Sequence, residues 1–303
     1  MDYTKYLQQK PLRFFRGANG NKRSIRLENG EYYMLKFPPE AKNKKNTELL
    51  YTNSCISEYV GCHIIQSLGM EAQETYLGTA KIKDKEKIVV ACKDFNLNGY
   101  FLQEFAAIKN GCINTSQNGY GTEIEEVLRA IREQEIYPAA ETEKFFWELF
   151  VADTLIGNFD RHNGNWGFLI NEELGDVKLA PVFDCGSSLY PQLSDKKMEE
   201  ILKNPEEIDI RIYVFPNSAL RVLDRKIHMG EFLLEDHGEF CRQAILEISD
   251  KTDFSKINLI VEETPFISEI RKEFYKTMLR ERYMKLVIPA YQKIKKVYAI
   301  SEE

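Results

Sequence analysis

The first third of the chain alternates short apolar or β-branched segments with turn-forming residues. These segments cover residues 12–16, 24–27, 31–37, 75–82 and 87–92. Runs of this length between turn-forming residues are typical of β-strands. The pattern therefore predicts one small antiparallel sheet in the N-terminal part of the chain.

A single helical pattern interrupts these strands between residues 47 and 68. Apolar residues recur there at three- and four-residue spacing, and Gly69 follows as a residue type that commonly ends helices. The pattern predicts one helix within the sheet region.

In the rest of the chain, apolar residues mostly follow helical spacing. The exception lies between residues 159 and 189, where two short extended segments, 166–170 and 177–180, are joined by a turn-prone hexapeptide. The sequence thus predicts an α+β protein, with a small antiparallel sheet and one helix in residues 1–95 and a mostly helical part in residues 96–303. The helices expected in this second part cover residues 123–133, 141–157, 230–248 and 265–299.

Composition and charge narrow the possible partners. The 303-residue chain is 43% hydrophobic and 29% charged, which is enough to bury a sizeable core. Its formal net charge of −6 gives no general attraction to nucleic acid or to an anionic membrane surface. We therefore expect neither nucleic acid nor a membrane among its partners.

Cysteine spacing and the N-terminal sequence bear on the compartment. The six cysteines lack the paired C-x-x-C spacing of zinc or redox motifs, and we interpret them as reduced thiols of the core. No signal peptide and no apolar run long enough to span a bilayer is visible. A cytoplasmic location is predicted, and secretion as an effector without a recognisable signal stays open.

Candidate chemistry is concentrated in the polar segment 157–165, between a predicted helix and a predicted strand. Asp160 and Asn165 are five positions apart, like the catalytic Asp and metal-binding Asn of the kinase loop D-x-x-x-x-N. A second acid, Asp184, follows a short strand, as does the metal-binding Asp of kinases. Such oxygen ligands suit Mg²⁺. His162 is interpreted as a loop-supporting residue rather than a proton relay.

Two N-terminal features fit the same chemistry. The turn at residues 17–22 combines two glycines with polar residues, so its backbone N–H groups could approach phosphate oxygens closely. Lys36 lies inside an apolar strand, where an ammonium needs counter-charges. A phosphate and a glutamate of the predicted helix would supply them, with Glu58 preferred over Glu48.

Taken in order, these motifs resemble those of the HipA-like kinases, and more narrowly the short, CtkA-type members that lack the extra N-terminal domain of the longer toxins. The resemblance is carried by residues 157–165, 179–184 and 35–38, and it extends over roughly residues 13–190. It implies a bilobed protein-kinase-like fold. It also implies a serine/threonine protein kinase that uses ATP and Mg²⁺ and that autophosphorylates.

The resemblance further implies roles for individual residues. Asp160 would orient or deprotonate the acceptor hydroxyl, and Lys36 would contact the α- and β-phosphates. Asn165 and Asp184 would hold Mg²⁺, and residues 93–95 would lie where backbone groups bind adenine. The expected nucleotide-binding residues are Gly17, Ala18, Asn19, Gly20, Asn21, Lys22, Lys36, Glu58, Lys93, Asp94, Phe95, His162, Asn165 and Asp184.

Two departures from the longer relatives limit what the resemblance implies. Those toxins carry a serine two residues before the loop glycine, and its autophosphorylation silences them, whereas this chain has Phe15 there. Ser24 and Thr4 remain as candidate phosphoacceptors. The missing domain removes part of the surface that longer relatives use against a DNA-binding antitoxin. An antitoxin-like partner is compatible with the resemblance but is not implied by it.

Two other functions stay open at the level of sequence. Small-molecule phosphotransferases share the two-lobe plan and the D-x-x-x-x-N loop, and a deep acidic acceptor pocket would favour that class. The second alternative is a nucleotide-binding pseudokinase that acts as an interaction module. Retention of Lys36, Asp160, Asn165 and Asp184 together argues against it. The protein substrate itself is not identified by these motifs.

Overall fold

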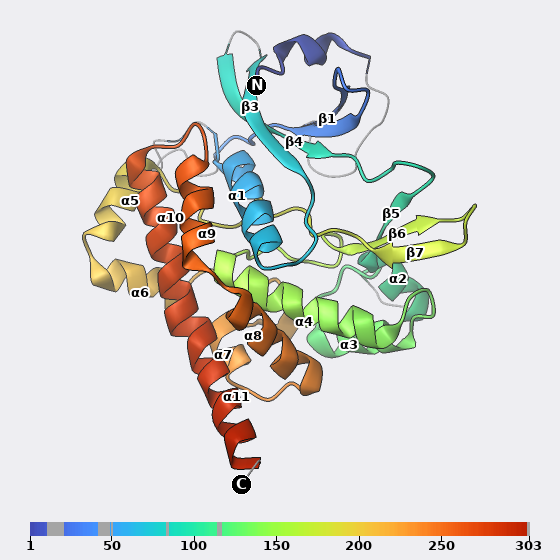
Figure 1. Ribbon diagram of the computed structural model, residues 1–303, viewed down its shortest axis with the longest axis vertical. Coiled ribbons are helices and arrows are strands. Elements are labelled where there is room, and N and C mark those ends of the chain that lie inside the picture. Colours follow the sequence, from blue (N-terminus) through green and yellow to red (C-terminus); the bar gives the residue numbers. More distant parts are fainter. Residues whose placement is uncertain (11–20, 42–48, 50, 83–84, 114–116, 302–303) are drawn as a thin grey trace.

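The computed structural model describes residues 1–10, 21–41, 49, 51–82, 85–113 and 117–301. The chain forms a small part built on a sheet, called here the sheet part, above a larger part that we call the helical part (Figure 1). The strand expected at residues 12–16 lies outside the described residues.

Four strands of the sheet part form an antiparallel sheet in the order β1-β2-β4-β3. Successive side chains point to opposite faces of a strand, and both faces of this sheet are covered. One face, which includes Leu35 and Val89, packs against Tyr3. The other, which includes Val90, packs against Cys55 of α1. The elements are η1 (Thr4–Gln8), β1 (Lys22–Arg26), β2 (Tyr32–Lys36), α1 (Ser54–Ser67), β3 (Thr75–Ile82) and β4 (Lys85–Lys93).

Helix α1 begins at Ser54, later than the expected residue 47. The chain just before it is held in other hydrogen bonds, because the N–H of Thr52 donates to the carbonyl of Pro39 at 2.9 Å. The N–H of Asn53 donates to the carbonyl of Pro191 at 2.8 Å. These long-range bonds fix the helix start, and periodicity alone could not locate it.

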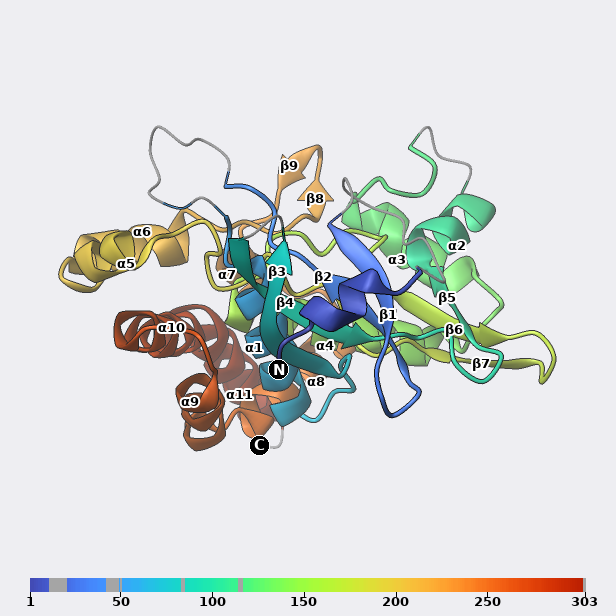
Figure 2. The same ribbon diagram turned by 90° about the horizontal axis from the view of Figure 1, so that it is seen from above.

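The helical part is built around α4 (Ala139–Ile156), which is buried along most of its length. Its apolar side chains share one large core with those of α1 and of the C-terminal helices. Beside it, β5 (Phe101–Glu104), β6 (Gly167–Asn171) and β7 (Asp176–Leu179) form a second antiparallel sheet. Figure 2, seen from above, shows this sheet on one side of the molecule. On the other side lie α9 (Phe254–Glu263), α10 (Glu269–Arg282) and α11 (Ile288–Ser301).

The C-terminal region contains more helices than the pattern indicated. The single helix expected at residues 230–248 is two helices, because Gly238 at φ 93° interrupts the chain between them. The one expected at 265–299 begins at Glu269, where the Ser268 side chain caps it. The remaining elements are α2 (Phe105–Cys112), α3 (Ile124–Glu133), α5 (Asp195–Leu202), α6 (Pro205–Tyr213), β8 (Arg221–Val222), β9 (Arg225–Lys226), α7 (Met229–Leu233), α8 (Glu239–Lys251), α9 (Phe254–Glu263), α10 (Glu269–Arg282), the π-helical turn η3 (Tyr283–Val287) and α11 (Ile288–Ser301).

The expected α+β architecture is confirmed. The four-stranded sheet ends at Lys93, and the next strand, β5, already pairs with β6 of the helical part. In the described part of the chain, no helix is both long enough and apolar enough to cross a membrane.

Candidate active site

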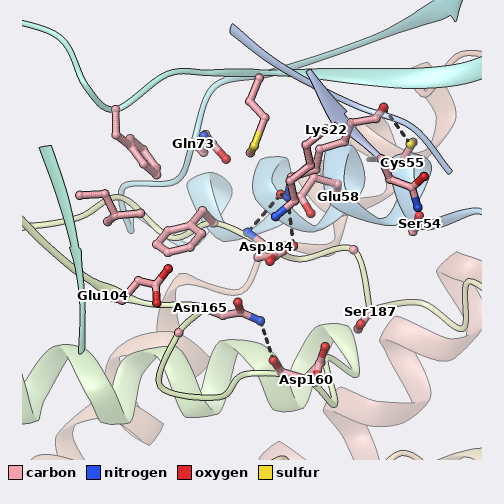
Figure 3. Close-up of a pocket in the computed structure, with 18 of the residues that line it drawn as sticks. Lys22, Ser54, Cys55, Glu58, Gln73, Glu104, Asp160, Asn165, Asp184 and Ser187 are labelled. Carbon is pink, nitrogen blue, oxygen red and sulfur yellow. Dashed lines mark hydrogen bonds and ion pairs between the residues drawn. The ribbon is translucent and has the colours of Figure 1, made fainter. Parts of the chain in front are cut away.

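A cavity of about 600 Å³ lies between the sheet part and the helical part. Figure 3 shows Lys22, Glu58 and Gln73 on its upper side and Asp160 and Asn165 below. Gly17, Ala18, Asn19 and Gly20 lie outside the described residues. The sequence-predicted residues that line the cavity are Asn21, Lys22, Lys36, Glu58, Asp94, Phe95, Asp160, His162, Asn165 and Asp184.

Lys36, the last residue of β2, reaches two carboxylates in this cavity. Its Nζ lies 2.9 Å from Oε1 of Glu58 on α1 and 3.0 Å from Oδ1 of Asp184. Burial opposes the charge on Lys36, but the two carboxylates outweigh it and raise the pKa of Lys36 well above its usual range. The expected ion pair with Glu58 is therefore present, and it ties the helix to the strand.

Asp184 lies in a left-handed backbone conformation, with φ 58°. Its N–H donates to Glu58 Oε1 at 3.1 Å, so Glu58 holds both the lysine and the backbone of the aspartate. Burial raises the pKa of Asp184, but Lys36 and Lys22 have the larger combined effect and hold it below its usual range. Asp184 is therefore a carboxylate at neutral pH, as a ligand for a divalent cation must be.

The segment with Asp160 follows directly from α4. Gly157, at φ 68°, ends that helix, and Nε of Arg282 donates to the carbonyl of Thr154 in its last turn at 2.7 Å. The Asn165 side-chain N–H donates to the Asp160 carbonyl at 2.8 Å and closes the loop. Burial, the largest influence, raises the pKa of Asp160, although nearby cations oppose the shift.

Arg161, which the sequence motifs did not single out, connects the two loops of the site. Its Nε and Nη2 donate to Asp153 of α4 at 2.8 and 3.2 Å. Its Nη1 donates to the carbonyl of Asn165 at 2.7 Å and also to the carbonyl of Phe183. One buried guanidinium thus joins helix α4, the Asp160 loop and the segment before Asp184. An Arg beside the motif Asp, with an Asp on the preceding helix, was the only signal in the sequence.

His162 supports its own loop. Its Nδ1 accepts a hydrogen bond from the N–H of Gly164 at 3.0 Å, and its ring lies edge-on to Tyr120 with centroids 6.2 Å apart. Tyr120 in turn donates to Glu104 at 2.8 Å. Tyr120 and Glu104 also line the cavity, and the sequence motifs did not point to either.

The three residues at the end of β4, residues 93–95, divide between the cavity and the surface. Asp94 and Phe95 line the cavity, but Lys93 does not. The ammonium of Lys93 instead lies 3.1 Å from both Glu31 and Glu74 at the surface. Its carbonyl accepts a hydrogen bond from Gln73, at 2.8 Å.

The chain has relatives of known class. The profile of the HipA-like C-terminal domain matches residues 13–233. The serine/threonine-protein kinase CtkA of Helicobacter pylori is 47% identical over 292 residues, which cover 96% of this chain and 87% of that protein. The crystal structure of a Helicobacter pylori proinflammatory kinase CtkA superimposes with a TM-score of 0.90 and 46% identity, covering 98% of both chains.

A more distant structure shares the fold alone. HipA of Shewanella oneidensis, solved with HipB and operator DNA, matches with a TM-score of 0.53 and 13% identity over 93% of this chain and 70% of that one. The chain therefore belongs to the HipA-like family. The expected enzyme class, a serine/threonine-protein kinase, is confirmed by the same relationship, and the class implies the use of ATP.

Proposed function

We propose that this chain transfers the γ-phosphoryl group of ATP, in the presence of Mg²⁺, to a serine or threonine hydroxyl of a protein. The bond from the γ-phosphorus to the β–γ bridging oxygen breaks, and a bond to the acceptor oxygen forms. ADP leaves, and the hydroxyl proton passes to Asp160. The observation that carries the proposal is the meeting of Lys36, Glu58 and Asp184 with Asp160 and Asn165 around one cavity.

The polar atoms of the cavity fit a magnesium nucleotide. Two buried acceptors, Oε2 of Glu58 and Oε1 of Gln73, have no hydrogen-bond partner among the described residues.

No cluster of three or more His, Cys, Asp or Glu residues with metal-binding geometry occurs among the residues that the structure describes. A Mg²⁺ ion delivered with a nucleotide needs only one or two carboxylates, since phosphate oxygens and water complete its shell. Asp184 and Asn165 would hold it.

Charge determines how the nucleotide would lie. Lys36 and Lys22 line the cavity with positive charge, so the phosphates would bind beside them. Phe95 lines the same cavity, with its ring 5.5 Å from that of Phe183, and offers an apolar surface to adenine. Bound ATP would supply the phosphoryl group that is transferred, and Mg²⁺ would neutralise the negative charge of that group.

Asp160 would orient the acceptor hydroxyl and take its proton. Burial raises the pKa of Asp160 toward the working pH, and a carboxylate with a raised pKa is a stronger base. The hydrogen bond from Asn165 to its carbonyl fixes the backbone at the base, which is what a reaction that depends on positioning requires.

Autophosphorylation and a protein acceptor belong to the same proposal. Ser24 is buried in β1 and cannot present its hydroxyl without local unfolding. Thr4 lies in η1 at the surface of the sheet part and is only half-buried. Thr4 is therefore the better acceptor of the two that the sequence suggested.

The test is phosphoryl transfer from γ-labelled ATP with Mg²⁺ to a generic protein, beside Asp160→Asn and Asp184→Asn variants. We expect label on serine or threonine, located by mass spectrometry, and a loss of about 10²-fold or more in each variant. Asp209→Asn, a change at an α6 residue that does not line the cavity and pairs with Lys285, is the control and should leave the rate unchanged.

Two results would overturn the proposal. Label on an added sugar or aminoglycoside but never on protein would assign the site to a small-molecule phosphotransferase. ATP binding without any transfer, in protein whose circular dichroism shows it to be folded, would make the chain a pseudokinase.

A further inference from the structure

An exposed surface beside Asp160 has no function in the proposed nucleotide site. The β8–β9 hairpin projects from the edge of the molecule between α6 and α3 (Figure 2). At its turn Leu223 is 85% exposed, and Val222 beside it and Phe215 after α6 are also exposed. Large apolar side chains in water are unusual when they cluster, and such clusters commonly mark a binding surface.

This surface is connected to the Asp160 loop by direct contacts. The ring of Phe215 lies 5.5 Å from that of Phe159, the residue before Asp160. Below the hairpin, Ser218 and Leu220 line the same small internal cavity as Asn158 and Arg161. The position of the hairpin is therefore linked to that of the catalytic loop.

The hairpin is fixed to the body of the helical part. The N–H of Arg221 donates to the carbonyl of Thr122, and the N–H of Asp224 donates to Oε1 of Glu123, both at 2.9 Å. The hairpin base is closed by the N–H of Ile227, which donates to the Leu220 carbonyl at 3.0 Å. The exposed side chains thus stand on a defined support.

Leu223, at the turn of the hairpin, disfavours the folded structure in two ways. Leu223 and Asp224 have φ values of 49° and 63°, the left-handed conformation that two-residue hairpin turns require and that Asn or Gly adopts with least strain. A leucine there strains the backbone and exposes its side chain to water. Such a combination in a well-anchored turn points to a role outside folding.

The hairpin also carries positive charge. Arg225 and Lys226 are exposed, and within the described residues no ion pair is formed by either. Lys226 is near enough to Asp160 to influence it electrostatically. In a chain with a net charge of −6, this cationic edge beside the phosphoacceptor position favours an acidic ligand.

We propose that Phe215, Val222, Leu223, Arg225 and Lys226 form an acceptor platform, which binds the segment of the substrate protein around its serine or threonine. An acidic side chain of that segment pairs with Arg225 and Lys226, and an apolar side chain packs on Leu223 and Phe215. This inference rests on the proposed kinase activity and adds to it a substrate class: acceptors flanked by acidic and apolar residues.

The test compares kcat/KM for serine peptides that carry one Glu at successive distances from the serine with matched peptides that carry Gln. For the unaltered protein we expect the best Glu peptide to exceed its Gln partner by about threefold to tenfold, as one or two exposed ion pairs allow. In the double variant Arg225→Gln/Lys226→Gln the ratio should fall to about one. Both peptides meet the same enzyme, so any change in the pKa of Asp160 cancels in the ratio.

Two further variants test whether the charge of the hairpin sets the preference for Glu peptides. One variant reverses a charge of the hairpin, and the other removes a charge from a different element. Lys226→Glu should reverse the preference, so that a peptide with Lys in the same position becomes the better substrate. Lys296→Gln removes one exposed cation from α11 and should leave the ratio as it is. An unaltered ratio in Arg225→Gln/Lys226→Gln would overturn the platform, as would a rise in KM for ATP instead of for peptide.

The apolar half of the platform has its own test. Leu223→Asn relieves the strained turn, so the melting temperature should stay or rise while KM for peptides with an apolar flank increases severalfold. An unchanged KM would remove Leu223 from the platform. Absence of transfer to any peptide would instead defeat the kinase proposal, whereas transfer without a Glu preference would defeat only the platform.

Discussion

Lys36 is held between two carboxylates, so its removal should affect both stability and activity. In Lys36→Met, Glu58 and Asp184 face each other without their cation. We expect the free energy of unfolding at pH 7 to fall by about 3 kcal/mol and phosphoryl transfer to fall by about 10²-fold or more. Urea unfolding and the labelled-ATP assay measure the two effects.

The pH dependence gives a sharper check of the same contact. The pKa of Asp184 is lowered in the folded state, so its stabilising contribution is present above the unfolded pKa near 3.9 and is lost as pH falls below it. The stability deficit of Lys36→Met should therefore be largest at pH 7 and shrink toward pH 3. Lys85→Met, an exposed change on β4, should show no such trend. A deficit that is constant with pH would contradict the ion-pair explanation.

At the scale of elements, Arg161 holds α4 and two loops together. Mutation can separate its two contributions, which are the charge that neutralises Asp153 and the hydrogen bonds that position the loops. Arg161→Met leaves Asp153 buried without its cation and should cost about 3–5 kcal/mol of stability. The double variant Arg161→Met/Asp153→Asn removes both charges and should regain much of that loss. Its kcat should stay low, because the bonds to the carbonyls of Asn165 and Phe183 are still missing.

Chemical denaturation and steady-state kinetics on the unaltered protein and on these two variants measure both effects. Recovery of kcat together with stability would mean that Arg161 serves folding alone. A double variant as unstable as Arg161→Met would show that the unpaired carboxylate is not the cause of the loss.

The same elements indicate what sequence could predict. The spacing of Asp160 and Asn165 within one loop points to them in the sequence, as does the position of Asp184 just after a short strand. Lys36 stands out because it is a lysine inside an apolar strand. All of these residues line the cavity. Arg161 was missed because its hydrogen bonds connect residues 153, 165 and 183, which no spacing relates. Residues 93–95 are expected where backbone groups bind adenine, and Asp94 and Phe95 do line the cavity. The Lys93 side chain, which that expectation does not concern, faces the surface, since neighbouring residues of an extended chain face opposite ways.

Two features of the fold likewise depend on more than the local sequence pattern. The strands of the sheet part follow from alternation, but the start of α1 depends on bonds from Thr52 and Asn53 to distant carbonyls. The division of the 230–248 helix depends on the backbone angle at Gly238. Both are decided by context rather than by periodicity.

For the whole molecule, a ligand that contacts both parts across the cavity should stabilise the fold by mass action. At a nucleotide concentration of 100 times Kd the expected gain is about 2.7 kcal/mol, or a shift of roughly 5 °C in Tm for a chain of this size. We expect ATP with Mg²⁺ to produce this shift in a thermal melt and ATP with EDTA to produce a smaller one.

Asp184→Asn serves as the matched variant, because it keeps the side-chain volume and removes one charge of the proposed metal ligand. It should melt at the same temperature with and without Mg²⁺ when ATP is present. An equal Mg²⁺-dependent shift in both proteins would place the ion elsewhere.

The contact between Arg282 and the Thr154 carbonyl bears on how this protein can be shortened. The matched family region ends at residue 233, yet α10 lies beyond it and supplies the buried guanidinium that closes α4 just ahead of the Asp160 loop. A polypeptide cut at that boundary would keep every residue of the proposed chemistry. It would lose the Arg282 guanidinium, which holds the end of α4 just ahead of the Asp160 loop. The smallest working fragment must therefore extend through Arg282.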